Sequence, residues 1–292
     1  MHSDLAKLPQ LGVGIGFREP FKSELFFHQD KVNFLEIVAE HYLDVLPQKE
    51  QELELLMAHF SLIPHGINLS IGSAEGIDEN YLQKLANLIH KINPPWWSEH
   101  LSFTKAGGID IGHLSPLPYT PEAVDVVCQN IQQVQRVIDV PLILENITYL
   151  LTIPGAKMTE AQFIGEIVER CNCGLLLDVT NLYTNSINHG YDALEFLNQL
   201  PLERVVQFHF TGGFWDGDVL IDSHSHATFS EVWQLMAEIC QRVTPKGMIL
   251  ERDENIPPFA ELVTELEQAR SFYRFSPHPQ PLSHGRRAYF IQ

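Results

Sequence analysis

Histidine, glutamate and aspartate residues stand at the ends of several short β-rich runs of this sequence. Such residues are seldom buried without a partner. Carboxylates that gather in one place repel each other unless they are protonated or neutralised by cations. Imidazole together with carboxylate suits iron, manganese or zinc, which indicates a metal site. The residues at the run ends are Glu40, His41, His65, Glu99, His100, Glu145, Asn146, Asp178, His209 and Glu251.

Two further segments, 180–192 and 212–227, carry more residues of these types, and we expect both to be loops. Asp222 and His224 are two positions apart, so they share one side of an extended segment. The number of potential ligand residues exceeds the three or four that one ion needs, which predicts two or three bound ions. His226 is equally well explained as a surface histidine. The ligand types in the two segments are Asn181, Asn188, His189, Asp222, His224 and His226.

Each of these residues alone has a simpler explanation. A lone His65 is more often a hydrogen-bonded core histidine than a metal ligand. Glu145 or Glu251 could form a structural ion pair with an arginine, and the candidate arginines are Arg204 and Arg252. The simpler explanation must account for acidic or imidazole residues at the same end of six strands. We therefore favour metal binding for the whole set.

The elements that must position these residues alternate between β-rich runs and amphipathic stretches. Apolar residues recur at spacings of three and four in the amphipathic stretches, which predicts helices at 48–60, 79–92, 121–138, 159–170, 229–242 and 257–272. Strands are predicted at 12–17, 33–39, 62–68, 96–100, 141–146, 174–179, 204–210 and 247–252. Eight strand–helix units predict a single α/β domain, a (β/α)8 TIM barrel, whose carboxyl mouth gathers the strand ends.

The barrel domain is predicted to span residues 11–273. Residues 1–10 are assigned as an N-terminal tail. Residues 274–292 carry three prolines and no apolar periodicity, so we expect a poorly ordered C-terminal tail. Its His278 and His284 are interpreted as surface histidines.

Charge and composition exclude several classes of protein. The 292 residues carry 19 Lys and Arg against 37 Asp and Glu, a formal charge of −18, which would repel nucleic acid. No apolar run approaches the ~20 residues of a membrane-spanning helix. The first ten residues lack the apolar segment of a secretory signal, so a cytoplasmic location is expected. Four scattered cysteines indicate reduced thiols.

Nine ordered motifs resemble those of the multinuclear non-haem iron-dependent oxidative enzymes, long catalogued as uncharacterised xylose-isomerase-like barrels. The best-known members include the oxidase of methanobactin biosynthesis and the enzyme that excises a carbon from a peptide's terminal cysteine. The resemblance runs from about residue 11 to 265. The motifs are HGINLSIGS (65–73), SEHLSF (98–103), LSPLPYT (114–120), LILENITYL (142–150), LLLDVTNLY (175–183), NHGYD (188–192), FHFTGG (208–213), LIDSHSH (220–226) and LERDENIPP (250–258).

The resemblance implies a cluster of two or three irons (Fe2+/Fe3+), with O2 as co-substrate. It implies that His65 and His100 hold one iron and that Glu145 bridges it to a second. It also makes Glu145, Asp178 and His209 the catalytic residues. Four positions in the two expected loops either complete the pair or bind a third iron. The implied metal ligands are His65, His100, Glu145, Asp178, Asn181, His189, His209, Asp222, His224 and Glu251.

The activity implied by the resemblance is oxidation of a ribosomally synthesised precursor peptide, typically at cysteine. Members usually work with a small partner protein that binds the leader segment, so a separate leader-binding partner is expected. This sequence departs from the family at Thr180 and at His41, since Asn is frequent at both positions. The first departure affects a contact near the cluster, and the second adds a ligand or alters substrate fit.

Three alternatives remain open at this point. A sugar isomerase or epimerase on the same barrel would use manganese or magnesium, but magnesium prefers oxygen ligands and this set is rich in imidazole. A trinuclear-zinc endonuclease is disfavoured by the charge of −18. A non-catalytic barrel that only binds a peptide would tolerate alanine at the mouth.

Overall fold

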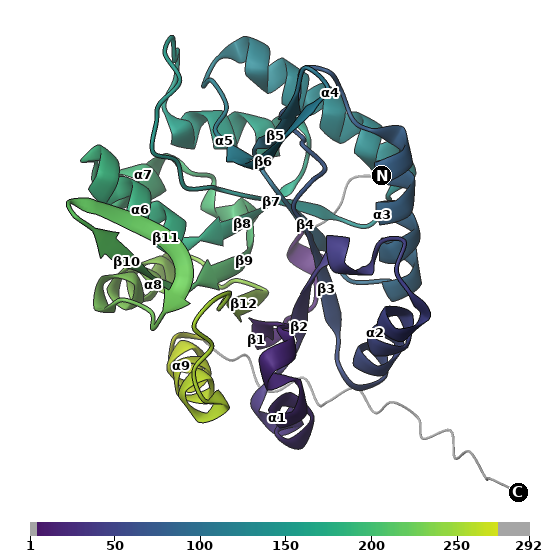
Figure 1. The fold of residues 1–292 in the computed structure, drawn as a ribbon. Coiled ribbons are helices and arrows are strands. Elements are labelled where there is room, and N and C mark those ends of the chain that lie inside the picture. The colour runs from purple at the N-terminus through teal and green to yellow at the C-terminus, as the bar shows by residue number, and fades with distance from the viewer. Residues whose placement is uncertain (1–4, 274–292) are drawn as a thin grey trace, which may run out of the picture.

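A closed barrel of parallel strands forms the centre of the molecule, in the order β1-β12-β9-β8-β7-β4-β3-β2 (Figure 1). The computed structural model describes residues 5–273; the predicted C-terminal tail, with His278 and His284, lies outside the described residues. The predicted TIM barrel is confirmed, and each predicted strand matches to within two residues at either end. The strands are β1 (Gly12–Gly16), β2 (Leu35–Val38), β3 (Leu62–Gly66), β4 (Trp97–His100), β7 (Leu142–Glu145), β8 (Gly174–Asp178), β9 (Val205–Phe210) and β12 (Gly247–Leu250).

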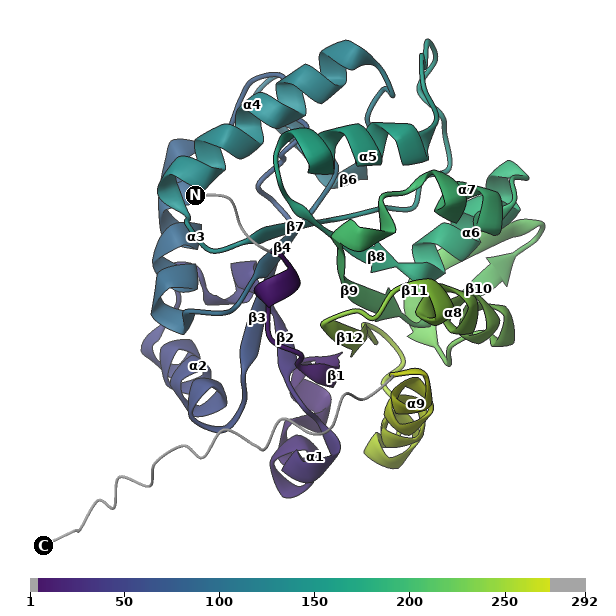
Figure 2. The ribbon, with the colours of Figure 1, turned by 180° about the vertical axis from the view of Figure 1, so that it is seen from behind.

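Helices surround this barrel and cover its outer face (Figures 1 and 2). All six predicted helices are present, because their apolar positions pack on the strands. Among the described residues, no helix is long and apolar enough to cross a membrane. The α-helices are α1 (Lys22–Phe27), α2 (Pro47–His59), α3 (Glu79–Ile92), α4 (Pro121–Val137), α5 (Glu160–Arg170), α6 (Val179–His189), α7 (Ala193–Gln199), α8 (Ser230–Arg242) and α9 (Phe259–Phe272).

The expectation of a loop over 180–192 was wrong, because α6 begins directly after β8. Asp178 caps this helix: its Oδ1 atom accepts a hydrogen bond of 2.7 Å from the amide of Asn181. The helix ends at Gly190, whose φ of 69° is left-handed. Polar residues obscure the apolar face of α6, although Val179 and Leu182 are buried.

The segment 212–227 is also not a loop. It forms an antiparallel hairpin of β10 (Gly212–Asp216) and β11 (Val219–His226), which turns at Gly217. A second hairpin, β5 (Phe103–Ala106) with β6 (Ile109–Ser115), follows β4. Both hairpins extend from the carboxyl ends of barrel strands and border the mouth (Figure 1).

The interior of the barrel changes from apolar to polar along its axis. Leu5, in the short 3-10 helix Leu5–Lys7, packs at the amino end, which faces the viewer in Figure 2. Gly14 leaves room there, since a Cβ at that position would lie 2.3 Å from the carbonyl oxygen of Phe34. The apolar layer consists of Phe34, Ile63, Trp96, Ile143, Leu176, Val206 and Ile249.

Polar residues follow this apolar layer two positions later on six strands, and five of the six are His, Glu or Asp. Because side chains alternate along a strand, a residue two positions after an inward apolar residue also points inward, one layer closer to the carboxyl mouth. The polar layer therefore forms above the apolar floor. Pairs of this kind are Phe34 and Glu36, Ile63 and His65, Trp96 and Ser98, Ile143 and Glu145, Leu176 and Asp178, and Ile249 and Glu251.

Candidate metal centre

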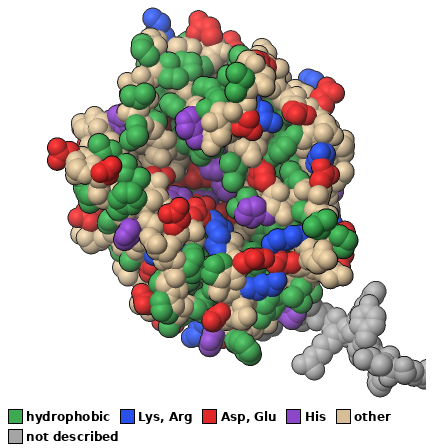
Figure 3. Space-filling model, viewed as in Figure 1, with side chains coloured by type: hydrophobic (Ala, Val, Ile, Leu, Met, Phe, Trp, Pro, Cys, Tyr) green, Lys and Arg blue, Asp and Glu red, His purple; other side chains and the backbone are tan. Residues whose placement is uncertain are grey.

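Three groups of ligand atoms lie at the carboxyl mouth, and within each group the atoms are within 4.8 Å of one another. Glu145 belongs to the first and second groups and Glu251 to the second and third, so the three form one continuous cluster. Figure 3 shows a hollow on this face in which histidine and acidic side chains gather. The groups are His65, His100 and Glu145; Glu145, Asp178, His209 and Glu251; and His224, Glu251 and Asp253.

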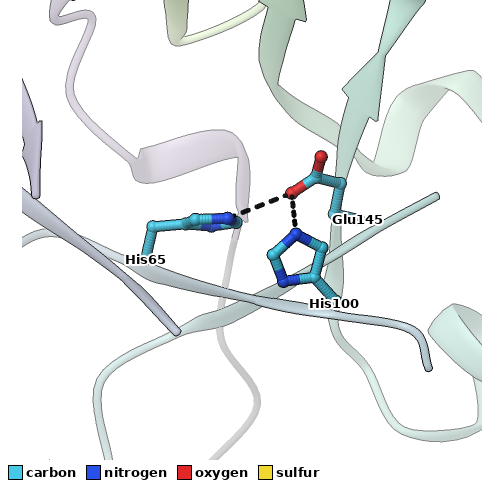
Figure 4. A group of neighbouring side chains, drawn as sticks. All are labelled: His65, His100 and Glu145. Carbon is cyan, nitrogen blue, oxygen red and sulfur yellow. Dashed lines mark ion pairs between the residues drawn. The ribbon is translucent and has the colours of Figure 1, made fainter. Parts of the chain in front are cut away.

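In the first group two imidazoles face one carboxylate (Figure 4). Oε2 of Glu145 lies 3.4 Å from Nε2 of His65 and 3.4 Å from Nε2 of His100. The other ring nitrogens have partners: Nδ1 of His65 lies 2.8 Å from Ser98 Oγ, and Nδ1 of His100 donates to the carbonyl oxygen of Gly66 at 3.0 Å. A proton held on Nδ1 leaves the Nε2 lone pair available to a metal.

In the second group the imidazole of His209 lies within 4.0 Å of several carboxylates. Its Nε2 atom lies 2.8 Å from Oε1 of Glu36, on the side away from the group. Its Nδ1 atom lies 2.8 Å from Glu251, 3.6 Å from Glu145 and 4.0 Å from Asp178. Atoms that bind one ion at about 2.1 Å lie about 3 Å apart when at right angles, so these separations are compatible with a shared cation.

The third group joins His224 of the hairpin that follows β9 to Glu251 and Asp253, which follow β12. Nε2 of His224 lies 2.8 Å from Asp222, and Nδ1 lies 3.2 Å from Asp253 and 3.5 Å from Glu251. His224 has a φ of 51°, a left-handed conformation that is uncommon outside glycine and is found at functional sites. Arg18 pairs with Asp253 and lies 3.6 Å from Glu251, so one cation already borders this group.

Several buried atoms of the cluster have no hydrogen-bond partner among the described residues. An unpaired buried polar atom is costly, and most are satisfied in folded proteins. Here the unpaired atoms belong to neighbouring groups, which a bound cation would satisfy together. Oxygen and imidazole donors without thiolate fit iron, manganese or zinc. The atoms are Glu145 Oε2, Asp178 Oδ2, Asn181 Oδ1, His209 Nδ1, Asp222 Oδ1 and both ring nitrogens of His224.

The pKa values of the buried carboxylates also favour a bound cation. Burial acts to raise the pKa of Glu145, but the imidazoles of His100 and His209 hold it at about 2. Burial and then the nearby Glu145 raise the pKa of Asp178 to about 8. Two buried carboxylates so close together do not both ionise readily at neutral pH. A divalent cation would favour the charged form of each.

The residues of α6 differ in their relation to the cluster. The amide of Asn181 donates to the capping Oδ1 of Asp178, and Nδ2 of Asn181 donates to the carbonyl oxygen of Asn146 at 3.0 Å. The Oδ1 atom of Asn181 is buried and has no hydrogen-bond partner among the described residues. His189, one of the predicted ligands, is not brought into any of the three groups. Its Nε2 lies 2.7 Å from the carbonyl oxygen of Tyr149, and the two rings stack.

Other acidic and imidazole residues at strand ends also lie outside the three groups. His41 is exposed, and so is His226, whose Nδ1 lies 2.7 Å from Ser225 Oγ. Glu40 accepts hydrogen bonds from two backbone amides of the segment after β3. Glu99 accepts one from the amide of its neighbour at 2.9 Å. The carboxylates of Glu40 and Glu99 therefore stabilise the backbone at the mouth of the barrel through hydrogen bonds.

Two residues that contact the cluster were missed from the sequence, Glu36 and Asp253. Glu36 stands two positions after Phe34, the same spacing that relates other inward pairs, so the alternation could have revealed it. Asp253 follows β12 without periodicity, and only the return of the chain beside β11 brings it to His224.

The alternative ion pairs of Glu145 or Glu251 with Arg204 or Arg252 do not form, although Arg18 lies 3.6 Å from Glu251. Arg252 pairs instead with Glu265 at 2.9 Å, and Arg204 hydrogen-bonds to Asn172 at 2.7 Å. The carboxylate of Glu145 meets only imidazoles among the ion pairs of the described residues. The structural explanation for this glutamate is therefore not supported.

The fold and the cluster define a (β/α)8 barrel with a buried group of side chains that could bind several metal ions. Residues 12–274 match the family model described as RiPP precursor modification enzyme MbnB/TglH/ChrH, where RiPP denotes a ribosomally synthesised and post-translationally modified peptide. The chain belongs to this family of peptide-modifying enzymes, which confirms the family resemblance seen in the sequence.

Relatives with similar sequences support this membership. A UPF0276 protein of Caulobacter vibrioides is 36% identical over 261 residues, covering 89% of this chain and 93% of the relative. A UPF0276 protein of Streptomyces avermitilis is 39% identical over 274 residues, covering 91% of this chain and 56% of that longer relative.

Solved structures share the fold at low identity. A D-tagatose 3-epimerase-like protein superposes with a TM-score of 0.60 at 14% identity, over 89% of this chain and 97% of the other. A xylose isomerase domain protein from Planctomyces limnophilus gives a TM-score of 0.53 at 14% identity, over 90% and 99%. These likenesses confirm the predicted xylose-isomerase-like barrel.

Proposed function

We propose that this protein uses two or three iron ions and O2 to oxidise a ribosomally synthesised precursor peptide, at a cysteine. Membership of the family implies that the substrate is a precursor peptide. The observation that carries the proposal is the continuous cluster of imidazole and carboxylate atoms, several of them buried and unpaired. Four histidines take part in the three groups, and this donor set favours a redox-active transition metal over magnesium.

The residues divide into three roles. His65, His100 and Glu145 would hold one ion, and Glu145 would also contact the second ion beside Asp178 and His209. Glu251 would complete the ligands of the second ion, and Asp222, His224 and Asn181 would add to that ion or hold a third. Bound iron would supply a Lewis acid for a substrate thiolate and electrons for the reduction of O2.

The protein's own contribution is to hold the ligand atoms in position. The imidazoles of His65 and His100 are each fixed through Nδ1, so their Nε2 atoms are oriented before substrate binds. Asp178 is fixed in the same way, since its Oδ1 caps α6 while Oδ2 stays unpaired. These contacts make the ligand positions rigid.

Metal analysis tests the proposal. Protein purified without oxygen from iron-57 medium should contain two or more irons per chain, with Mössbauer spectra of coupled iron. Stoichiometric zinc or manganese would instead favour hydrolytic or isomerase chemistry. We expect a separate leader-binding protein as partner, which would co-purify when it and the precursor are co-expressed.

A further inference from the structure

A cavity of about 390 Å³ opens beside the third group, between β6, the segment after β7, helix α6 and β11. Asp222 forms part of its wall, and the Oδ1 atom of this residue lies 2.8 Å from Nε2 of His224. The cavity and the candidate metal centre therefore share a wall. Its apolar lining consists of Leu114, Pro116, Leu150, Leu151, Leu220 and Ile221.

Helix α6 holds two walls of this cavity in place. Asn185 donates to the carbonyl oxygen of Ile147 at 2.9 Å and accepts from the amide of Tyr149 at 3.2 Å. One turn later, Asn188 makes the same pair of bonds to Leu220, at 2.8 Å and 2.9 Å. A cavity with fixed walls loses little entropy when it is filled.

The rim and lining indicate what the cavity binds. Leu150 and Leu151 are 65% and 79% exposed beside it, and large exposed apolar side chains at a cavity mark a binding site. No Lys or Arg lines it. A second cavity of about 390 Å³, which includes Leu117 and Val126, shares no residue with the three groups.

We propose that the cavity beside Asp222 is a subsite for an apolar side chain of the precursor peptide, next to the residue that is modified. The inference rests on the proposed function, because the occupant is the substrate of the neighbouring cluster. Because Asp222 lines the cavity and also contacts His224 of the candidate metal centre, we expect the side chain in the cavity to belong to a residue one or two positions from the reacting one. Thr148, which also lines the cavity, donates to Oδ2 of Asp222 at 3.0 Å. A side chain bound in the cavity would therefore contact residues that are hydrogen-bonded to the candidate metal centre.

A displayed pool of peptides, randomised around a fixed central cysteine, tests this subsite. The pool is captured on immobilised, metal-loaded protein and the retained peptides are sequenced. Wild type should enrich Leu, Ile, Val, Phe or Met at a position next to the cysteine. Combining Leu150→Asp with Leu151→Asp should lower that enrichment about ten-fold or more, because charge replaces the apolar rim. Leu46→Asp is the matched control, since Leu46 is 73% exposed and does not line this cavity.

The outcomes separate this inference from the proposed oxidation. Loss of the apolar preference in the double variant, but not in the control, supports the subsite. Absence of a preference in wild type, or its survival in the double variant, overturns the subsite. The peptides retained on the protein are then incubated with iron(II) and O2, and their masses are measured by mass spectrometry. An apolar preference without any mass change would leave the subsite standing and refute the oxidation.

Discussion

The carboxylate of Glu36 on β2 lies 2.8 Å from Nε2 of His209 on β9, on the far side of the ring from the cluster. Glu36 is itself held by Gln207, whose Nε2 donates to it at 2.6 Å, and Gln207 accepts from Trp96. A polar chain thus runs from the apolar floor to the candidate ligand. It engages Nε2 of His209 and leaves Nδ1 to be presented to a metal.

Glu36→Gln should weaken metal binding about 10- to 100-fold, because the imidazole loses a charged partner that orients it and raises its basicity. Competition with a chromogenic chelator measures this affinity. Glu52→Gln is the control, since Glu52 is also buried but pairs with Lys22 and Lys49 away from the cluster. Equal affinities in wild type and Glu36→Gln would remove the positioning role.

Glu145→Ala should lower the iron content by at least one ion per chain. The reason is that Glu145 belongs to two of the three groups, so its loss affects two ions. Iron is measured by mass spectrometry of acid-digested protein, with circular dichroism to check the fold. An unchanged iron content would contradict the bridging role.

Asp178→Ala should abolish peptide oxidation while the barrel still folds. It removes an oxygen donor of the second group and the cap of α6, and losing such a cap costs about 1 kcal/mol. Asp178→Asn separates the two effects, since its side-chain oxygen can still cap the helix. We expect Asp178→Asn to recover most of the stability but not the activity. A fully active Asp178→Asn protein would exclude the carboxylate from the site.

Asn181→Ala and His189→Ala should differ in metal content. Asn181 contacts Asp178 through its amide and leaves a buried Oδ1 unpaired, whereas Nε2 of His189 meets the carbonyl oxygen of Tyr149. We therefore expect Asn181→Ala to lower metal occupancy and His189→Ala to leave it near the wild-type value. A loss of one ion in His189→Ala would restore the sequence-based assignment of this histidine as a ligand.

Thermal stability should depend on pH through Glu160, which belongs to none of the three groups. Burial raises the pKa of Glu160 from its ordinary 4.5 to about 7, although Tyr149 donates to it at 2.9 Å. The folded state then holds this proton to higher pH than the unfolded state. The contribution to stability is complete below about pH 4.5 and is lost as the pH rises through about 7.

Glu160→Gln removes that loss. The Tm of the variant relative to wild type should therefore rise by a few degrees between about pH 5 and pH 8, measured on metal-free protein. Parallel Tm curves for the two proteins over this range would show that Glu160 is ionised normally. Glu166→Gln, at a half-buried position of the same helix, is the control.

The sequence by itself determined the barrel and most of its strands. Apolar runs of four to seven residues between amphipathic stretches leave few other folds. It also determined which strands end in potential ligands, since His65, Glu145 and Asp178 stand at the carboxyl ends of their strands whatever the helices do. Period-two alternation then turns these side chains inward.

Only the tertiary structure decided which ligand types meet. Glu40 and Glu99 stand at strand ends as Glu145 does, yet they bind backbone amides rather than joining a group. His189 and Asn181 share one helix, but Asn181 lies in its first turn beside Asp178, whereas His189 is its last residue and meets the carbonyl oxygen of Tyr149. Asp253 reaches His224 through the return of a hairpin, a long-range contact that local spacing does not encode. Residue type and period specify a side chain's face along its own element, while the packing of elements specifies its neighbours.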